Sequence, residues 1–404
     1  MTNTNLPYET LEEAVEIARS LAPKLRERVA EAEAERRLPK ENVRDLLDSG
    51  LIALEVPKRF GGAELNLDAL IEVTGAIGEG CPATGWVYSL WTAHMWLIGQ
   101  YPEHIQAMVF GDRNSLVSSV VNTVGTPVAV EGGFRWTGRG FFSSGVDHCN
   151  WLTAAVDLKP QEPPGDRRWF LLKRSDFEIV DDWHTVGLRG TGSKTIEFND
   201  IFIPDERAVL QKDLSEGKGL GATMYGSPLY CAAMDFTFSL PIAAPVIGIA
   251  RAAVRELEGR IRKRLESSSY RIAAEQTGTL TRIAEASAQI DAARALLLDT
   301  ARRFCFIPAA EATSLDKAEC RRNVAFATQL CRHAANSVFE AAGASNLYES
   351  SDLQRLWRDS NVASMHHGSM WDVHGLAYGR EVVGLPPSWQ SGIKTAEAEE
   401  KTAG

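Results

Sequence analysis

Histidine and serine side chains that could move a proton gather in three short stretches of the chain. His94 follows Trp91 in a tryptophan-rich run, Ser143 and Ser144 precede a glycine, and His366 is followed by a second histidine. A histidine gains or loses a proton near neutral pH, and a serine hydroxyl both donates and accepts hydrogen bonds. Each group also has a structural explanation, His94 as a core histidine and the serines as a Ser-Ser-Gly turn. The residue types are those of a proton-transfer site.

Three other patterns resemble known sites without fitting them. His366, His367 and His374 lack the H-E-x-x-H spacing of a helical zinc site, so we predict no metal. Residues 187–194 (GLRGTGSK) lack the Lys-then-Ser/Thr order of a phosphate loop, and residues 217–221 lack the spacing of a dinucleotide fingerprint. The sequence therefore predicts neither a metal centre nor a nucleotide phosphate loop.

The bulk composition narrows the class of protein. The 404 residues carry a formal charge of −10, which argues against nucleic acid or an anionic membrane as the main partner. Six cysteines without a C-x-x-C pair predict free thiols in a reducing cytoplasm. The first residues have neither a basic nor an apolar signal region, and no long uninterrupted apolar window predicts a membrane span. We expect a cytoplasmic protein.

Helical patterns occupy both ends of the chain. Apolar residues recur at helical spacing up to about residue 114, and residues 85–98 carry no charge, which predicts a buried helix. Long helices return after about residue 231. One is predicted over 272–303, where alanine is frequent and glycine and proline are rare, and another over 326–341.

The middle of the chain has the pattern of short strands. Gly132 and Gly133 separate two strand-like runs, which is a hairpin signal. Residues 151–156, 168–172, 195–198 and 201–203 are further strand-like runs. Several short strands of this kind predict a small barrel or sandwich. Helices, then strands, then helices predict an α+β fold rather than a doubly wound sheet.

Several local motifs, taken in order, resemble proteins of the acyl-CoA dehydrogenase fold. They are VPKRFGG (56–62), Trp136-Thr-Gly with Phe142-Ser-Ser-Gly, GLRGTGSK (187–194) with IFIP (201–204), FEAAGA (339–344) and LWRD (356–359). The resemblance runs from about Leu11 to Pro387. It implies an N-terminal helical domain (1–114), a middle β-barrel domain (115–225) and a C-terminal four-helix bundle (226–390). The Lys-, Glu- and Ala-rich composition of residues 391–404 predicts a flexible tail.

Two details resemble the reduced-flavin hydroxylases of this fold more than the dehydrogenases. Dehydrogenases with a late base have Tyr-Glu-Gly after the Arg-Asp motif, whereas this chain has His366-His367-Gly368. Trp86-Val-Tyr-Ser, His94-Met-Trp and Phe142-Ser-Ser-Gly are similar to two-component aromatic hydroxylases. The resemblance implies hydroxylation of a small phenol- or indole-type substrate through a flavin C4a-hydroperoxide.

The resemblance also implies roles for single residues. His94 would deprotonate the aromatic substrate, Ser143 would place a hydroxyl near flavin N5 with Ser144 as the second choice, and His366 would lie at the flavin edge. His367 occupies the place of the missing dehydrogenase glutamate, so either histidine could face the flavin. The implied substrate-binding residues are Trp91, Ser118, Ser119 and His367; the implied cofactor-binding residues are Phe142, Ser143, Ser144, Arg271, Gly343 and Ala344, with the last three acting across a subunit interface.

The implied cofactor is reduced FMN, or FAD, with O2 as co-substrate. The implied partners are a separate NAD(P)H:flavin reductase, an aromatic substrate and three further copies of the chain in a homotetramer. Three alternatives remain open: an N- or S-oxygenating relative, an FAD-dependent acyl-CoA dehydrogenase and a non-catalytic flavin-binding scaffold. The sequence leaves the substrate and the reductase open.

Overall fold

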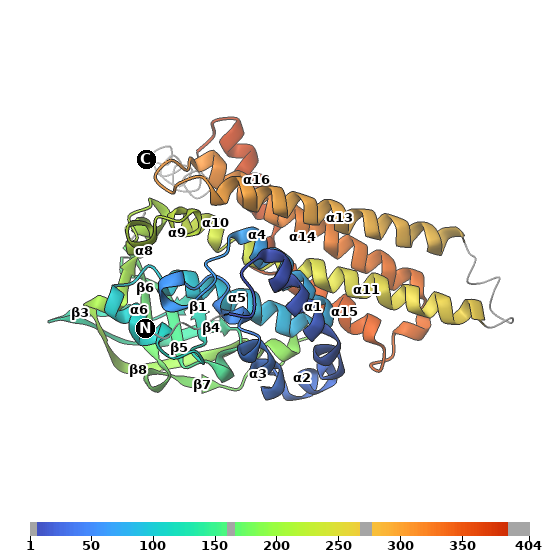
Figure 1. The fold of residues 1–404 in the computed structure, drawn as a ribbon, viewed down its shortest axis with the longest axis horizontal. Helices are drawn as coiled ribbons and strands as arrows, with labels where there is room; N and C mark the ends of the chain where they lie inside the picture. The colour runs from blue at the N-terminus through green and yellow to red at the C-terminus, as the bar shows by residue number, and fades with distance from the viewer. Residues whose placement is uncertain (1–5, 160–165, 267–276, 387–404) are drawn as a thin grey trace, which may run out of the picture.

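The fold is known from a computed structural model, which describes residues 6–159, 166–266 and 277–386. Strands gather at one end of the molecule and long helices at the other, with α4 and α5 between them (Figure 1). The α+β architecture predicted from the sequence is confirmed: along the chain, a helical N-terminal part is followed by a middle part of two sheets and a helical C-terminal part.

The N-terminal part is helical. Thr10 caps α1 with a reciprocal bond to Glu13, and Pro39 precedes α3. The helix predicted over 85–98 is present, begins at Pro82 and is almost entirely buried. The helices are α1 Leu11–Glu27, α2 Val29–Glu35, α3 Lys40–Asp48, α4 Leu67–Gly80, α5 Pro82–Ile98 and α6 Glu103–Phe110.

The middle part consists of two sheets that share one core. The first has the order β1-β5-β6-β9 with β1 parallel to β5; the second has the order β2-β4-β8-β7, and β3 pairs with β4. Phe134, Trp136, Phe170 and Phe198 from both sheets fill the core between them. The strands are β1 Val117–Val120, β2 Asn122–Val124, β3 Val128–Val130, β4 Gly133–Ser143, β5 Trp151–Asp157, β6 Arg167–Lys173, β7 Glu178–Val180, β8 Lys194–Pro204 and β9 Ala208–Leu210.

One strand prediction was wrong. Residues 195–198 and 201–203 belong to a single strand, β8, not to two. Trp136 pairs with Ile201 and Gly138 with Phe198, so Asn199 and Asp200 face one residue of β4. The apparent turn is therefore a β-bulge, in which Asp200 takes φ 48° and the strand continues.

The C-terminal part is a bundle of long helices. Four short helices connect it to the sheets, and α11, α13, α14 and α15 then pack side by side (Figure 1). The helix predicted over 272–303 is present as α13, although residues 272–276 lie outside the described part. The helices are α7 Gln211–Ser215, α8 Leu220–Tyr225, α9 Pro228–Cys231, α10 Met234–Thr237, α11 Leu240–Glu266, α13 Thr277–Cys305, α14 Ser314–Ala342, α15 Asp352–Ala363 and α16 Trp371–Val382.

The apolar helix α11 is part of the core. The span Met234–Glu266 is long and apolar enough to cross a membrane, with a mean hydropathy of 1.5 over its most apolar window. However, 78% of that window is buried inside the protein, and α11 packs against α4, α5 and the other bundle helices. Its composition is that of a central core helix.

Candidate active site

Helix α5 brings two polar aromatic side chains to the edge of the first sheet. Pro82 starts the helix, and Gly85 lets it approach α4 so closely that a Cβ there would lie 2.5 Å from the Cα of Gly78. Trp86 and His94 are eight residues apart, or about 12 Å along the helix axis. Helix α5 therefore holds Trp86 at one end of the candidate site and His94 at the other.

The end of β4 forms a turn that is pinned against α5. Phe142 and Gly145 both have positive φ, 66° and 69°, which bends the chain sharply around Ser143 and Ser144. A Cβ at Gly145 would lie 2.8 Å from the indole of Trp91, so only glycine fits there without rearrangement. Trp91 lies fully buried behind this turn. The side chain predicted to bind substrate therefore supports the turn from behind.

Ser143 is enclosed by its own hydrogen bonds. Ser118 Oγ donates to the backbone oxygen of Ser144 at 2.8 Å and lies 2.9 Å from Ser143 Oγ. Since Ser118 has a single hydrogen and gives it to the carbonyl, Ser143 must donate to Ser118. Both side chains are completely buried. Neither hydroxyl has a free hydrogen for a flavin or a substrate.

Ser144 faces the opposite way and keeps some exposed surface. The indole nitrogen of Trp86 donates to its Oγ at 3.3 Å, and Ser193 Oγ lies 2.8 Å away. Trp86 in turn meets His366 edge-on, with 5.8 Å between ring centroids. Ser144, the second choice from the sequence, is therefore the hydroxyl that the structure groups with Trp86 and His366.

His94 is held as a neutral ring of known tautomer. Its Nδ1 lies 2.8 Å from the carbonyl oxygen of Val117, so Nδ1 carries the hydrogen and donates it. Burial lowers the pKa of His94 to about 4, with only 5% of the residue exposed. Phe238 flanks the ring at 5.9 Å. The Nε2 lone pair of His94 is left free to accept a proton.

His366 has the opposite tautomer. Its Nδ1 accepts a hydrogen bond from the backbone nitrogen of Gly368 at 3.1 Å, so the single ring hydrogen lies on Nε2. Desolvation by the surrounding protein lowers the pKa of His366 to about 4, although the ring keeps solvent-accessible surface. His366 therefore presents an N–H donor, whereas His94 presents a lone pair.

The neighbouring histidines are used structurally. His374 Nε2 bonds the backbone oxygen of His367 at 3.0 Å, and the two rings contact edge-on. His366, and not His367, contacts Trp86. Within the described ranges, no three His, Cys, Asp or Glu side chains are grouped to hold a metal ion.

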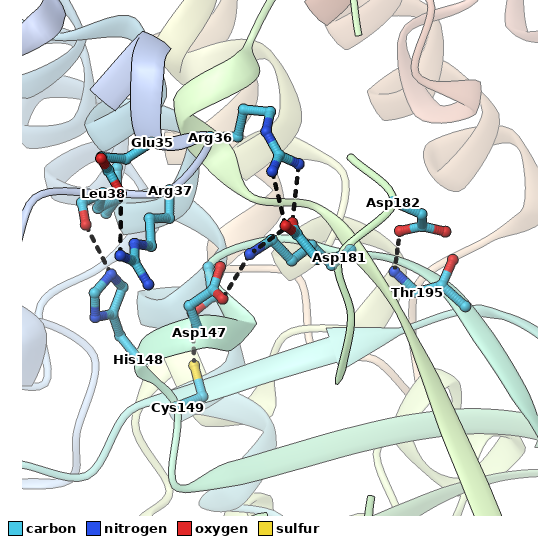
Figure 2. Close-up of polar contacts among 12 residues, drawn as sticks. Glu35, Arg36, Arg37, Leu38, Asp147, His148, Cys149, Asp181, Asp182 and Thr195 are labelled. Carbon is cyan, nitrogen blue, oxygen red and sulfur yellow. Dashed lines mark hydrogen bonds and ion pairs between the residues drawn. The ribbon is translucent and has the colours of Figure 1, made fainter. Parts of the chain in front are cut away.

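A buried ion pair supports the serine turn from the second sheet. Lys194 Nζ lies 2.8 Å from Asp147 and 3.2 Å from Asp181, and Arg36 binds the same Asp181 through two nitrogens. Figure 2 shows Arg36, Asp147 and Asp181 converging. Arg36 lowers the pKa of Asp181 to about 2. Gly192 has φ 52°, and a Cβ there would lie 2.7 Å from Asp147 Oδ2, so this position favours glycine.

We expect Lys194→Met to lower the free energy of unfolding by about 3 kcal/mol, because it leaves Asp147 buried without its partner. Lys194→Arg should retain most of the stability. The matched control is Lys212→Met, since Lys212 is exposed and pairs loosely with Glu216. Urea denaturation measures all three; equal effects for Lys194 and Lys212 would contradict the structural role of the pair.

The lowered pKa of His94 predicts a pH-dependent stability. Because the folded pKa of about 4 lies below the unfolded value of about 6.5, the unfolded chain binds more protons between these values. The free energy of unfolding should fall by about 2 kcal/mol from pH 7.5 to pH 5 through His94. Denaturation at both pH values, in the wild type and in His94→Asn, isolates this contribution. An unchanged pH dependence in the variant would contradict it.

The remaining predicted site residues lie at separate positions in the fold or outside the described residues. Phe142 is 63% exposed and meets Trp183 edge-on, and Ser119 has a buried hydroxyl without a partner. Gly343 and Ala344 follow the end of α14 and are separated from His366 by helix α15, which is about 18 Å long. Arg271 lies outside the described residues.

Sequence reasoning missed the second layer of the site. Ser193 bonds Ser144 directly, Thr191 bonds Ser193, and Lys194 pairs with Asp147, which follows the turn. The backbone nitrogen of Gly145 also donates to Thr191 O at 2.8 Å. Small and hydroxyl residues in GLRGTGSK (187–194) were the available signal.

A surface hollow elsewhere in the described part of the chain does not coincide with these residues. It has a volume of about 460 Å³, opens beside α3 and is lined by exposed charged side chains together with His148. It contains none of the predicted site residues. We therefore place the site by its polar side chains and their unused hydrogen-bonding capacity.

Comparisons with known proteins show the family to which the chain belongs. Residues 9–107 and 240–371 match the families described as acyl-CoA dehydrogenase N-terminal domain and C-terminal domain. The chain is 31% identical to the oxygenase subunit HsaA of a flavin-dependent monooxygenase from Mycobacterium tuberculosis, over 91% of this chain and 94% of that one. It is 30% identical to the oxygenase component of p-hydroxyphenylacetate 3-hydroxylase from Acinetobacter baumannii, over 92% and 89%.

Solved structures give the same result. The 3-HSA hydroxylase from Rhodococcus sp. RHA1 superposes with a TM-score of 0.88 at 29% identity, covering 95% of this chain and 99% of that one. XiaF from Streptomyces sp., solved with FADH2 and glycerol, superposes with a TM-score of 0.85 at 29% identity, covering 94% and 96%.

Proposed function

Because the chain belongs to the flavin-dependent monooxygenases of the acyl-CoA dehydrogenase fold, we propose that it hydroxylates a small phenol- or indole-type substrate. It is the oxygenase component of a flavin-dependent monooxygenase and uses reduced flavin. The observation that supports the substrate class most strongly is the pair of complementary histidines. His94 offers a lone pair where a substrate hydroxyl or N–H needs an acceptor, and His366 offers a donor.

The residues around Ser144 fit the edge of a flavin. Ser144 has an oxygen with unused acceptor capacity, His366 has an unused Nε2–H, and Phe142 offers an exposed ring on the same strand end. When bound, the reduced flavin supplies the two electrons that activate O2. We assign Ser144 to the flavin N5 side in preference to Ser143, whose hydroxyl is enclosed. His366 would donate at the adjacent edge and restrict water there.

His94 would bind and deprotonate the substrate. Its Nδ1–H bond to Val117 fixes the ring orientation, and its Nε2 lone pair can take the proton of a phenol or indole donor. Removing that proton makes the aromatic ring more electron-rich and a better nucleophile. A neutral ring is required for this task, and the lowered pKa of His94 keeps the ring neutral at physiological pH. Ser119, with its unpartnered hydroxyl, is a further candidate for substrate contact.

A separate reductase is the expected partner, because relatives are named oxygenase components or subunits. An NAD(P)H:flavin reductase would supply the reduced flavin by diffusion. Both FMN and FAD should be tested as the flavin, and the relative solved with FADH2 supports including FAD. Six free cysteines, none in a disulfide, support a cytoplasmic location.

Exposed apolar side chains on the bundle support self-association, and we propose a homotetramer. Trp371, Leu376 and Val383 on and after α16 are exposed beside Phe326 of α14, which contacts Trp371. We keep Gly343 and Ala344, which follow the end of α14, as candidates for contact with a neighbouring subunit's flavin. Light scattering of the wild type and of Leu376→Glu tests this: a monomeric wild type would contradict the proposal.

The direct test of substrate class uses labelled oxygen. Photoreduced flavin, the protein and a panel of phenols and indoles are mixed with ¹⁸O2, without any reductase. Reduced flavin, O2 and one aromatic C–H should give oxidised flavin, one labelled C–OH and water. Label in a sulfoxide or an N-oxide product instead would contradict aromatic hydroxylation, and unlabelled product would contradict oxygen insertion from O2.

A further inference from the structure

Three buried hydroxyl groups form a continuous hydrogen-bonded row behind the flavin side of the site. Thr191 Oγ1 lies 2.7 Å from Ser193 Oγ, and Ser193 Oγ lies 2.8 Å from Ser144 Oγ. The row begins at the backbone oxygen of Leu188, which is 2.8 Å from Thr191 Oγ1. All three hydroxyl residues are buried. Water therefore does not replace these partners.

The direction of the row follows from counting hydrogens. A carbonyl oxygen only accepts, so Thr191 must donate its one hydrogen to Leu188. Thr191 can then only accept from Ser193, which uses the single hydrogen of Ser193. Ser193 can in turn only accept from Ser144. The hydrogen of Ser144 is therefore directed into the protein.

The acceptor capacity of Ser144 can be counted in the same way. A hydroxyl oxygen accepts two hydrogen bonds, and the indole N–H of Trp86, which can only donate, takes one of them. One acceptor position remains. Ser144 therefore meets any further group as an acceptor and not as a donor.

The start of the row is anchored, which keeps its direction fixed. Leu188 adopts φ 49°, its N–H donates to the buried Asp359 at 2.6 Å, and its carbonyl also accepts from Trp183 at 3.1 Å. The carbonyl that sets the direction therefore cannot turn away without breaking several bonds. Reversing the row would remove the hydrogen between Thr191 Oγ1 and the Leu188 carbonyl, so that lone pairs of these two oxygens would face each other at 2.8 Å.

We propose that the Thr191–Ser193–Ser144 row makes this site select reduced over oxidised flavin. N5 of a reduced flavin carries a hydrogen and donates it, whereas N5 of an oxidised flavin has only a lone pair. Ser144, fixed as an acceptor, can accept a hydrogen bond from N5–H of the reduced flavin. It has no hydrogen to donate to the N5 lone pair of the oxidised flavin. This inference rests on the proposed placement of flavin N5 beside Ser144. Thr191 and Ser193 act through Ser144 and are positioning residues.

The selectivity has a consequence for a two-component system. Reduced flavin arrives from another protein and oxidised flavin must leave after each turnover. A hydrogen bond that forms only with the reduced form favours the binding of reduced flavin and the release of oxidised flavin, without any change in the shape of the site.

The test measures dissociation constants of oxidised and photoreduced FMN under anaerobic conditions by absorbance and fluorescence titration, and repeats both with FAD. The wild type should bind the reduced form more tightly. Thr191→Val and Ser193→Ala release the hydrogen of Ser144, so the preference should fall about tenfold, the equivalent of one hydrogen bond. Thr191→Ser keeps the row and should keep the preference. Thr300→Val, which removes a buried hydroxyl on α13, is the matched control and should also keep it.

The variant Ser144→Ala distinguishes failure of the proposed flavin placement from failure of the proposed role of the hydroxyl row. If Ser144→Ala leaves both dissociation constants unchanged, Ser144 is not beside the flavin and the proposed placement fails. If Ser144→Ala lowers the preference while Thr191→Val and Ser193→Ala keep the wild-type value, the placement stands and the row is overturned. Thermal unfolding of each variant identifies any that fails to fold, and Ser193→Ala, the smallest change, then carries the result.

Discussion

His94→Asn is expected to lower the rate of product formation by about 10²- to 10⁴-fold, the range for losing a positioned general base. The asparagine amide can still donate to Val117 as Nδ1 of His94 does, so the helix and the strand stay connected. Only the Nε2 lone pair is lost. Oxidation of reduced flavin should continue and yield hydrogen peroxide in place of product. Parallel assays of product and peroxide, per flavin consumed, measure the effect.

Flavin binding provides the control for this variant. Because His94 lies about 12 Å from Trp86 along α5, the dissociation constant of the flavin should stay within about twofold of the wild type, a difference well below one hydrogen bond. Full product formation by His94→Asn would contradict the base role. Loss of flavin binding would show that His94 belongs to the flavin site instead.

His366→Asn is expected to lower product formation by about 10²- to 10³-fold, as removal of one preorganised donor does elsewhere. An asparagine oxygen can still accept from the Gly368 N–H, so the turn after α15 should persist. The lost group is the Nε2–H of a ring that contacts Trp86 edge-on. Unlike His94→Asn, this variant should alter the reaction of reduced flavin with O2 even when no aromatic substrate is present.

His367→Asn is the matched control, since the ring of His367 contacts His374, whereas the ring contact with Trp86 is made by His366. It should keep most of the activity. If His367→Asn abolished product formation and His366→Asn did not, the assignment of the two histidines would be reversed.

The sequence was sufficient to predict the helices and strands whose residue patterns are local. The uncharged run 85–98 predicted the buried helix α5, and the Gly132–Gly133 pair predicted the hairpin between β3 and β4. The same local reasoning failed at Asn199 and Asp200. A bulge and a turn use the same residue types, and only pairing with β4 distinguishes them.

The choice between Ser143 and Ser144 could not be made from strand alternation. A register shift between Gly140 and Ser143, with Phe142 at positive φ, breaks the two-residue period where it is needed. The choice between His366 and His367 has a similar cause, because both lie in a tight turn where neither helix nor strand spacing applies. Which ring points inward depends on packing against Trp86, which is 280 residues earlier in the chain.

The measurement that tests the central claim most directly is stopped-flow absorbance of the protein with reduced flavin mixed with O2. The account predicts a species whose spectrum is that of neither reduced nor oxidised flavin, and which lasts much longer than free flavin takes to reoxidise. Oxidised flavin appearing as fast as in buffer, together with reduction of protein-bound oxidised flavin by an acyl-CoA, would contradict the account and identify a dehydrogenase.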